Sequence, residues 1–205
     1  MIRPPWDGVA FSDAADGDIR NDLTARARLA VRLAIEPEWA SVRQVHGSVV
    51  LKADAPGDVG EADAIWTDRR DLPVAVFTAD CLGVALLSSG AVGVAHAGWR
   101  GAAAGVVAHL REQMSGEGHH PDRAAVGPGI GPCCFEVGPE VADRFDTVSK
   151  TSWGTTSVDL AGSVAADLAG IEVWDSRACT HHGENWFSHR RDATKDRLAT
   201  VAWLT

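Results

Sequence analysis

The chain has 205 residues, of which 45% are hydrophobic and 23% charged, the composition of an ordinary globular protein with room for one large domain. Its formal net charge of −9 argues against a general nucleic-acid binder and against a protein of anionic membrane surfaces. No apolar run approaches the roughly 18 residues of a membrane span, and residues 1–8 lack a secretion signal pattern, so we expect a cytoplasmic protein whose four cysteines serve metal binding or catalysis rather than disulfides.

The first quarter of the chain predicts one helix and a pair of strands. Residues 1–21 show little pattern, and residues 39–53 predict a hairpin-like strand pair that turns at Gly47, followed by a polar loop at 54–61. Asn21 or Asp22 can cap a helix that runs to about Ile35 and is ended by Pro37. Its predicted apolar face consists of Leu23, Ala27, Ala30, Val31 and Ala34.

Apolar, β-prone runs dominate the middle of the chain. Their low polarity predicts strands buried on both faces, at residues 62–67, 72–78, 82–87 and 91–96. The remaining predicted elements are a helix at 101–114, a strand at 123–127, short helices near 138–145 and 157–169, and closing strands at 171–174 and 198–204. No repeat or Pro/Ser-rich linker divides the sequence, which favours a single domain over residues 1–205.

Three short segments carry metal-capable side chains. They are Gln-Val-His-Gly with His46, Thr-Ala-Asp-Cys with Cys81, and His-Ala-Gly-Trp-Arg-Gly, which starts at His96. Two histidines and one cysteine suit a catalytic zinc site whose fourth position stays open to water or substrate. The long separations along the chain argue against a zinc finger and suit ligands that tertiary packing brings together.

Each of these residues also has a simpler interpretation. His96 could be a buried histidine hydrogen-bonded at a strand end, and Cys81 a small core residue, although Asp80 beside it would be costly to bury unpaired. His46 alone could be satisfied within its own turn. The helix predicted after His96 offers a positive N-terminus that, with Arg100, could bind an anion, but Arg100 equally suits a surface ion pair.

Further cysteines and histidines leave their roles open. The Gly/Pro-rich residues 127–131 lack the lysine of a phosphate-binding loop and predict a plain turn. The adjacent Cys133 and Cys134 suit a structural or substrate-lining role. The polar stretch near the C-terminus favours a surface loop, with a second metal cluster as the alternative, for which the candidate ligands are Cys179, His181, His182 and His189.

Taken together, the segments resemble the laccase-domain or multicopper polyphenol oxidase family, more recently described as purine nucleoside phosphorylases. The resemblance implies an α/β fold with a mixed β-sheet sandwich flanked by helices, and zinc ligands at His46, Cys81 and His96. It runs from about residue 42 to the C-terminus through RQVHGSVV, EADAIWTD, VAVFTADCLGVALL, VGVAHAGWRGAAAGVV, VGPGIGPCCFEVGPEV and FSHRRD.

Some positions depart from the family pattern. The N-terminal segment is short and lacks the usual Arg-Gly-Gly-Ser element, Phe135 and His189 each stand where Tyr is usual, and Gly83 replaces a frequent Pro. These departures bear on substrate preference, whereas the three implied metal ligands are intact.

The resemblance implies phosphorolysis of purine nucleosides, namely adenosine, inosine, guanosine or methylthioadenosine, and deamination of adenosine. The implied cofactor is Zn²⁺, with copper as a possibility, and the implied partners are purine nucleosides and phosphate. We expect Arg43 and Arg100 as phosphate contacts and Asp80 as a proton carrier. The sequence leaves open the preferred nucleoside, the balance between the two reactions, and whether the protein is a monomer or a dimer.

Three other functions compete. Multicopper oxidation needs several coppers and hence roughly ten His or Cys ligands, usually in His-x-His pairs. The chain has only eight histidines and no His-x-His motif, so it lacks the ligands for such a site. A hydrolase with Cys81 as nucleophile and His96 or His46 as base is the second rival. A metal-binding module without catalytic activity is the third.

Overall fold

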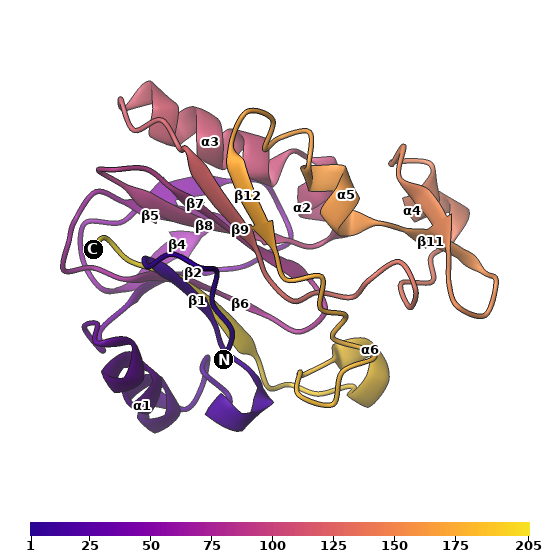
Figure 1. Cartoon of the computed structure of the whole chain (residues 1–205), viewed down its shortest axis with the longest axis horizontal. Coiled ribbons are helices and arrows are strands. Elements are labelled where there is room, and N and C mark those ends of the chain that lie inside the picture. The colour runs from indigo at the N-terminus through magenta and orange to yellow at the C-terminus, as the bar shows by residue number, and fades with distance from the viewer.

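Two β-sheets packed against one another form the centre of the computed structural model, which describes residues 1–205 (Figure 1). The five-stranded sheet has the order β1 (Val9–Phe11), β13 (Leu198–Ala202), β6 (Val74–Thr78), β2 (Ala40–Arg43) and β4 (Gly57–Glu61). The six-stranded sheet has the order β12 (Glu172–Asp175), β9 (Arg123–Val126), β7 (Leu82–Leu87), β8 (Val92–Ala97), β5 (Ala64–Thr67) and β3 (Val50–Lys52). Both sheets mix parallel and antiparallel pairs.

The remaining elements are helices and one small ribbon. The ribbon pairs β10 (Val148–Lys150) with β11 (Thr156–Val158). The helices are the 3-10 turn η1 (Ala14–Asp16), α1 (Leu23–Leu33), α2 (Trp99–Ala103), α3 (Val106–Gly116), α4 (Pro139–Ala142), α5 (Leu160–Val164) and α6 (His189–Asp192). None of them is long and apolar enough to cross a membrane.

Three hydrophobic clusters separate four layers. Leu29 and Leu33 of α1 pack on the five-stranded sheet, and Leu110 of α3 packs on the six-stranded sheet. The third cluster, which includes Phe11 and Ile65, fills the space between the sheets. Every residue of β6, β7 and β8 is buried because these strands have a packed layer on both sides.

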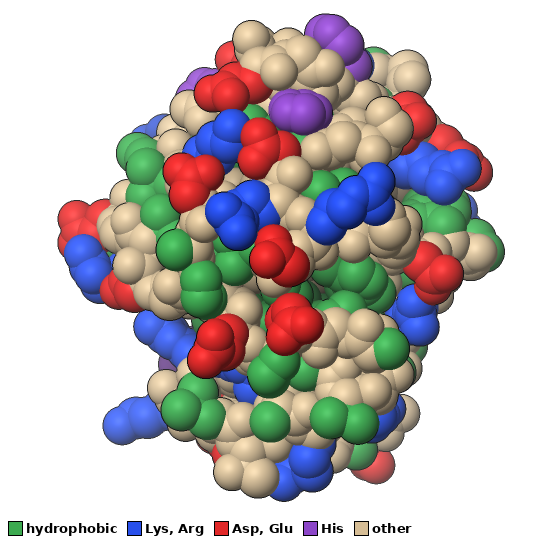
Figure 2. Space-filling view, turned by 90° about the vertical axis from the view of Figure 1, so that its left-hand side faces the viewer, with side chains coloured by type: hydrophobic (Ala, Val, Ile, Leu, Met, Phe, Trp, Pro, Cys, Tyr) green, Lys and Arg blue, Asp and Glu red, His purple; other side chains and the backbone are tan.

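The structure confirms the predicted fold class, an α/β sandwich of mixed sheets flanked by helices. The four apolar runs form β5, β6, β7 and β8, and the capped helix forms α1, where the Asp22 carboxylate accepts hydrogen bonds from the N–H groups of Thr24 and Ala25. The molecular surface on the side shown in Figure 2 carries interspersed acidic and basic side chains and no broad basic area.

Several local predictions were wrong. Of the predicted face of α1 only Ala30 is buried, whereas Leu23 and Val31 are exposed. The other buried residues are Ala25, Leu29 and Leu33, at a spacing of four. That helix stops at Ala34 in a left-handed conformation, before Pro37 can act.

Two further differences concern chain connections. The predicted hairpin at 39–53 does not form, because β2 and β3 belong to different sheets. The predicted helix at 101–114 is two helices, α2 and α3, which separate at Gly105 with φ +72°. The strands β1, β4, β10 and β11 and the short helix α6 were not predicted, and of the helix predicted near 157–169 only α5 forms, after β11.

Candidate metal centre and pocket

His46, Cys81 and His96 come together in space. One ligand atom from each lies within 4.8 Å of the other two. The two imidazole rings meet edge to face, with centroids 4.8 Å apart and planes at 76°. His96 is buried, Cys81 is half-buried and His46 is exposed, so the group opens to solvent on one side.

Two crossings between the sheets deliver two of these residues. Residues 44–49 lead from β2 in one sheet to β3 in the other, and residues 79–81 lead from β6 to β7 in the same way. His46 and Cys81 lie on these crossings, whereas His96 lies on β8 opposite Gly83 of β7. The antiparallel pairing of β7 with β8 therefore places His96 near Cys81.

Asp63, the residue immediately before β5, fixes the positions of the two histidines relative to one another. Its fully buried carboxylate accepts hydrogen bonds from the backbone N–H groups of Val45, His46 and Gly47 at 3.1, 2.9 and 2.6 Å. It also accepts a hydrogen bond from Nδ1 of His96 at 2.8 Å. Because Nδ1 is engaged, His96 presents Nε2 to the group, which is the usual arrangement of a carboxylate behind a metal-binding histidine.

Gly98 leaves the space that an ion would need. A Cβ at this position would lie 3.0 Å from Sγ of Cys81 and 3.1 Å from Cδ2 of His46. The nearby Gly101 has the same restriction, because a Cβ there would lie 2.8 Å from the carbonyl oxygen of Gly47. The two glycines thus let the start of α2 approach the His46 loop closely, and the donor set of two imidazoles and one thiolate fits a transition metal such as zinc.

Charge is concentrated on Cys81 and His96. Burial raises the pKa of the Cys81 thiol, but hydrogen bonds and charge from His46 and His96 outweigh it and lower that pKa to about 6. Burial lowers the pKa of His96, but hydrogen bonds to Asp63 and Cys81 outweigh it and raise that pKa to about 9. For Asp63, burial raises the pKa, while the bonds from His96 and Gly47 bring it below its usual value. Cys81 is therefore a thiolate near neutral pH, the form that binds metals.

The group opens into a cavity of about 370 Å³. Aromatic side chains from three parts of the chain, Phe77, Trp99 and Phe135, give it flat apolar surface. Three arginines also line it. They are Arg20, Arg190 and Arg197.

Asp80 lines the same cavity and ties together distant segments. Its Oδ1 accepts a hydrogen bond from the Thr180 hydroxyl and its Oδ2 accepts one from the backbone N–H of Arg190, both at 2.6 Å. Its carbonyl oxygen accepts a hydrogen bond from the N–H of Ile130 at 2.7 Å. With φ +84°, Asp80 is in a conformation that non-glycine residues rarely adopt, so these contacts hold a strained turn next to Cys81.

The two arginines predicted from the sequence as phosphate contacts, Arg43 and Arg100, do not line the cavity. The Arg43 guanidinium pairs with Asp58 at 3.1 Å and with Glu61 at 3.5 Å on the exposed side of β2 and β4. Arg100 lies over the ring of Trp99, with its guanidinium carbon 4.3 Å from the centroid, in a separate depression.

Several residues that position the group were not identified from the sequence. Asp63 was missed although an acidic residue in the otherwise apolar run 62–67 is itself a signal, since a buried carboxylate needs partners. Gln44 was also missed. Its side-chain amide exchanges two hydrogen bonds with the backbone of Phe77, at 2.8 and 2.9 Å, and so fixes the start of the His46 crossing.

Known proteins resemble this chain in sequence and in fold over nearly its full length. A protein of Streptomyces griseus named purine nucleoside phosphorylase ORF3 is 39% identical, with 97% of this chain and 91% of that protein aligned. The Escherichia coli purine nucleoside phosphorylase YfiH is 35% identical over 98% of this chain and 88% of its own.

A solved structure agrees. The crystal structure of YlmD from Geobacillus stearothermophilus superposes with a TM-score of 0.84 at 28% identity, covering 99% of this chain and 94% of that one. The family model described as multi-copper polyphenol oxidoreductase laccase matches residues 1–205. The chain therefore belongs to this laccase-like family, in which the similar proteins of Streptomyces griseus and Escherichia coli carry the name purine nucleoside phosphorylase.

Proposed function

We propose that the protein is a zinc-dependent purine nucleoside phosphorylase. The observation that carries the proposal is the convergence of His46, Cys81 and His96 beside Gly98 at the end of an aromatic, arginine-lined cavity. Relatives that align with almost the whole chain are named for this activity. When bound by these residues, zinc would supply a Lewis acid with an open position.

Phosphorolysis requires three tasks from the protein. A phosphate oxygen forms a bond to C1′ of the ribose as the bond from C1′ to the base breaks, which gives ribose 1-phosphate and the free base. The phosphate needs cationic partners, the purine needs a flat apolar surface, and the departing base needs a proton. The cavity offers side chains for each task.

Arg20 is the best placed cation for phosphate. It lines the cavity, and its guanidinium makes no hydrogen bond or ion pair within the chain. Arg190 is held differently, because its guanidinium donates to the carbonyl oxygen of Glu136 at 3.0 Å and lies over Phe135. Arg43 and Arg100 stay predictions as phosphate contacts and would need to leave their present partners to reach the cavity.

Asp80 stays the proposed proton carrier. It lines the cavity beside Cys81, and its two hydrogen bonds fix the direction of the carboxylate. Phe135 and Trp99 are the proposed surfaces for the purine ring. Adenosine deamination, which the family resemblance also implies, would use the same cavity and is measured as ammonia released from adenosine.

The experiment pairs metal analysis with phosphate-dependent release of base from adenosine and inosine. We expect about one zinc per chain at this site and base release, both lost in Cys81→Ala and in His46→Ala. His120→Ala is the matched control because His120 is exposed and lies outside the group. Base release that persists without metal in Cys81→Ala would contradict the proposal.

One observation favours a second candidate function. A thiolate at Cys81 next to a protonated His96 resembles the pair of a cysteine hydrolase. Alkylation of Cys81 that zinc does not prevent, together with hydrolysis in the absence of metal, would support that function. Polyphenol oxidation, which the family description names, is tested by copper content and oxygen consumption with a phenol.

A further inference from the structure

A second group of metal-capable side chains lies outside the site described above. Its members are Cys133 and Cys134, which follow the Gly/Pro-rich turn 127–132, and Cys179 and His182, in the polar stretch near the C-terminus. One ligand atom from each lies within 4.8 Å of the other three. Sγ of Cys133 and Nδ1 of His182 are 3.5 Å apart.

The backbone holds these two segments against one another. Gly129 pairs with Cys179 as a short parallel bridge, in which Gly129 N–H donates to Ala178 at 3.2 Å and Thr180 N–H donates to Gly129 at 2.9 Å. The N–H of Gly131 donates to Sγ of Cys179 at 3.3 Å, the type of contact that stabilises a thiolate.

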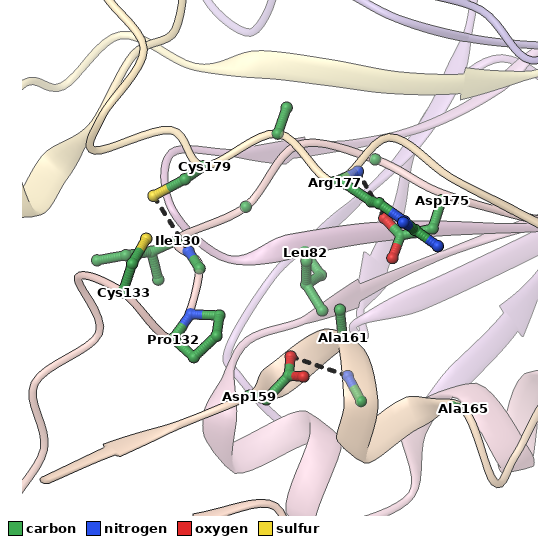
Figure 3. Close-up of a pocket in the computed structure, with 15 residues that line it drawn as sticks. Leu82, Ile130, Pro132, Cys133, Asp159, Ala161, Ala165, Asp175, Arg177 and Cys179 are labelled. Atoms are coloured by element: carbon green, nitrogen blue, oxygen red, sulfur yellow. Dashed lines mark hydrogen bonds between the residues drawn. The ribbon is translucent and has the colours of Figure 1, made fainter. Parts of the chain in front are cut away.

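Gly131 lies beside two of the sulfurs, where a side chain would approach them closely. A Cβ on Gly131 would lie 3.3 Å from Sγ of Cys133 and 3.6 Å from Sγ of Cys179. Figure 3 shows Cys133 and Cys179 at one end of a second cavity, with their sulfur atoms turned toward one another and a dashed hydrogen bond that ends on the sulfur of Cys179. Glycine at position 131 therefore keeps a side chain from crowding the two sulfurs.

We propose that Cys133, Cys134, Cys179 and His182 bind a second zinc ion. Tetrahedral zinc with bonds of about 2.3 Å to sulfur and about 2.0 Å to nitrogen places its donors roughly 3.4 to 3.8 Å from one another. The Cys133–His182 distance already has this value, and every other pair of ligand atoms would need to close by at most about 1 Å, a shift of the size that a small change in side-chain torsion produces. Three soft thiolates with one imidazole select zinc over magnesium or calcium.

The donor count distinguishes this site from the first. Four protein ligands close the coordination sphere, as in structural zinc sites, whereas the group of His46, Cys81 and His96 leaves a position open. The proposed second ion is therefore structural. On binding, each cysteine thiol that is still protonated gives its proton to solvent, so that the ion is held by thiolates.

The second ion would support the wall of the first cavity. It would join segments that lie 49 residues apart in the chain at Cys133 and His182, and closing a long loop stabilises the folded state. Thr180, one residue after Cys179, donates to the Asp80 carboxylate, and Ile130 lines the cavity that holds His46, Cys81 and His96. Thr180 adjoins the ligand Cys179 and Ile130 lies three residues before the ligand Cys133, so the ion would fix the positions of both.

Metal content of reduced protein, purified without chelator, tests the proposal. We expect about two zinc ions per chain in the unchanged protein and about one in each of Cys81→Ala and Cys179→Ala. The variant that carries both changes should bind none. One zinc in the unchanged protein that Cys179→Ala leaves in place would overturn the proposal.

Cobalt spectra locate the remaining ion. Cobalt in Cys81→Ala should show strong thiolate charge-transfer absorption from three cysteines, and cobalt in Cys179→Ala the weaker absorption of one. Equal spectra in the two variants would contradict the second site.

A milder change guards against misfolding of Cys179→Ala. His182 is exposed, so His182→Ala should fold and should lose its second zinc to a chelator at least about tenfold faster, because one ligand is gone. His181→Ala is the matched control, since His181 is the neighbouring histidine outside the group. Equal loss rates in the two variants, or a disulfide between Cys133 and Cys179 in the freshly purified protein, would overturn the proposal.

Discussion

Nδ1 of His96 donates a buried hydrogen bond of 2.8 Å to Oδ1 of Asp63. The same oxygen accepts the backbone N–H of His46 at 2.9 Å, so one carboxylate orients both proposed imidazole ligands. Asp63 thus sets the distance between the His46 crossing and strand β8. Changes at Asp63 should therefore alter the metal site more than the fold as a whole.

Asp63→Asn is expected to weaken metal binding by about 10- to 100-fold, the usual loss when a partner behind a metal-binding histidine is changed. The amide keeps the volume but brings N–H groups toward the N–H groups of Val45 and Gly47. Competition with a chromophoric chelator measures the loss. Asp58→Asn, on the exposed pair with Arg43, is the control and should leave affinity unchanged. Equal affinities in the two variants would exclude this role.

Gly98→Ala is expected to displace the metal from a chain that still folds. The added methyl would lie 3.0 Å from the Cys81 sulfur and 3.1 Å from His46, and such crowding costs about 1–3 kcal/mol. Metal content and thermal unfolding, measured together, separate the two effects. Gly116→Ala is the control, because a Cβ there meets nothing within 4 Å. Full metal content in Gly98→Ala would contradict the close packing of Gly98 against Cys81 and His46.

Arg20→Ala is expected to raise the KM for phosphate by about 10- to 150-fold, because a hydrogen bond to a charged group contributes about 1.5–3 kcal/mol. Arg43→Ala and Arg100→Ala test the earlier candidates in the same assay. We expect a smaller change for Arg43 than for Arg20, because the Arg43 guanidinium must first leave Asp58 and Glu61 to reach the cavity. A larger effect at Arg43 or Arg100 than at Arg20 would move the phosphate site.

Zinc binding to the first site should release protons in a pH-dependent way. The raised pKa of His96, about 9, means that this imidazole is protonated below pH 9, and the lowered pKa of Cys81, about 6, means that the thiol is ionised above pH 6. Between these values about one proton, that of His96, must leave when zinc binds. Release should fall as the pH rises through 9 and increase as it drops through 6.

Calorimetry in buffers with different ionisation enthalpies measures this release. The Cys179→Ala variant is the right protein, because the proposed second site would add its own protons. Constant release from pH 6 to pH 10 would show that Cys81 and His96 are not paired as described.

The metal-capable residues could be predicted from the sequence because few side chains bind transition metals, and because Cys81 and His96 lie at the ends of fully buried strands. His46, between the partly exposed β2 and β3, was predicted from its motif. The arginines could not be predicted. Arg43 is close to His46 along the chain, but its side chain leaves β2 toward Asp58 and Glu61, and sequence proximity does not give that direction.

The same limit explains the errors in the fold. Apolar runs predicted β5 to β8 well, since burial on both faces leaves a clear pattern. The hairpin at 39–53 failed because local hydrophobicity does not say which sheet a strand joins. The face of α1 failed because the exposed Leu23 and Val31 are as apolar as the buried Leu29 and Leu33, so hydrophobicity alone did not identify the buried side.

The two crossings between the sheets have a consequence for the order of folding. His46 and Cys81 each lie where the chain passes from one sheet to the other, so neither sheet alone contains the complete ligand set. A partly folded chain with only the six-stranded sheet formed would have Cys81 and His96 close together through the pairing of β7 with β8, but it would lack strand β2, which leads into the His46 crossing. Tight metal uptake therefore reports that both sheets have docked, and it should lag behind the appearance of β-structure during refolding.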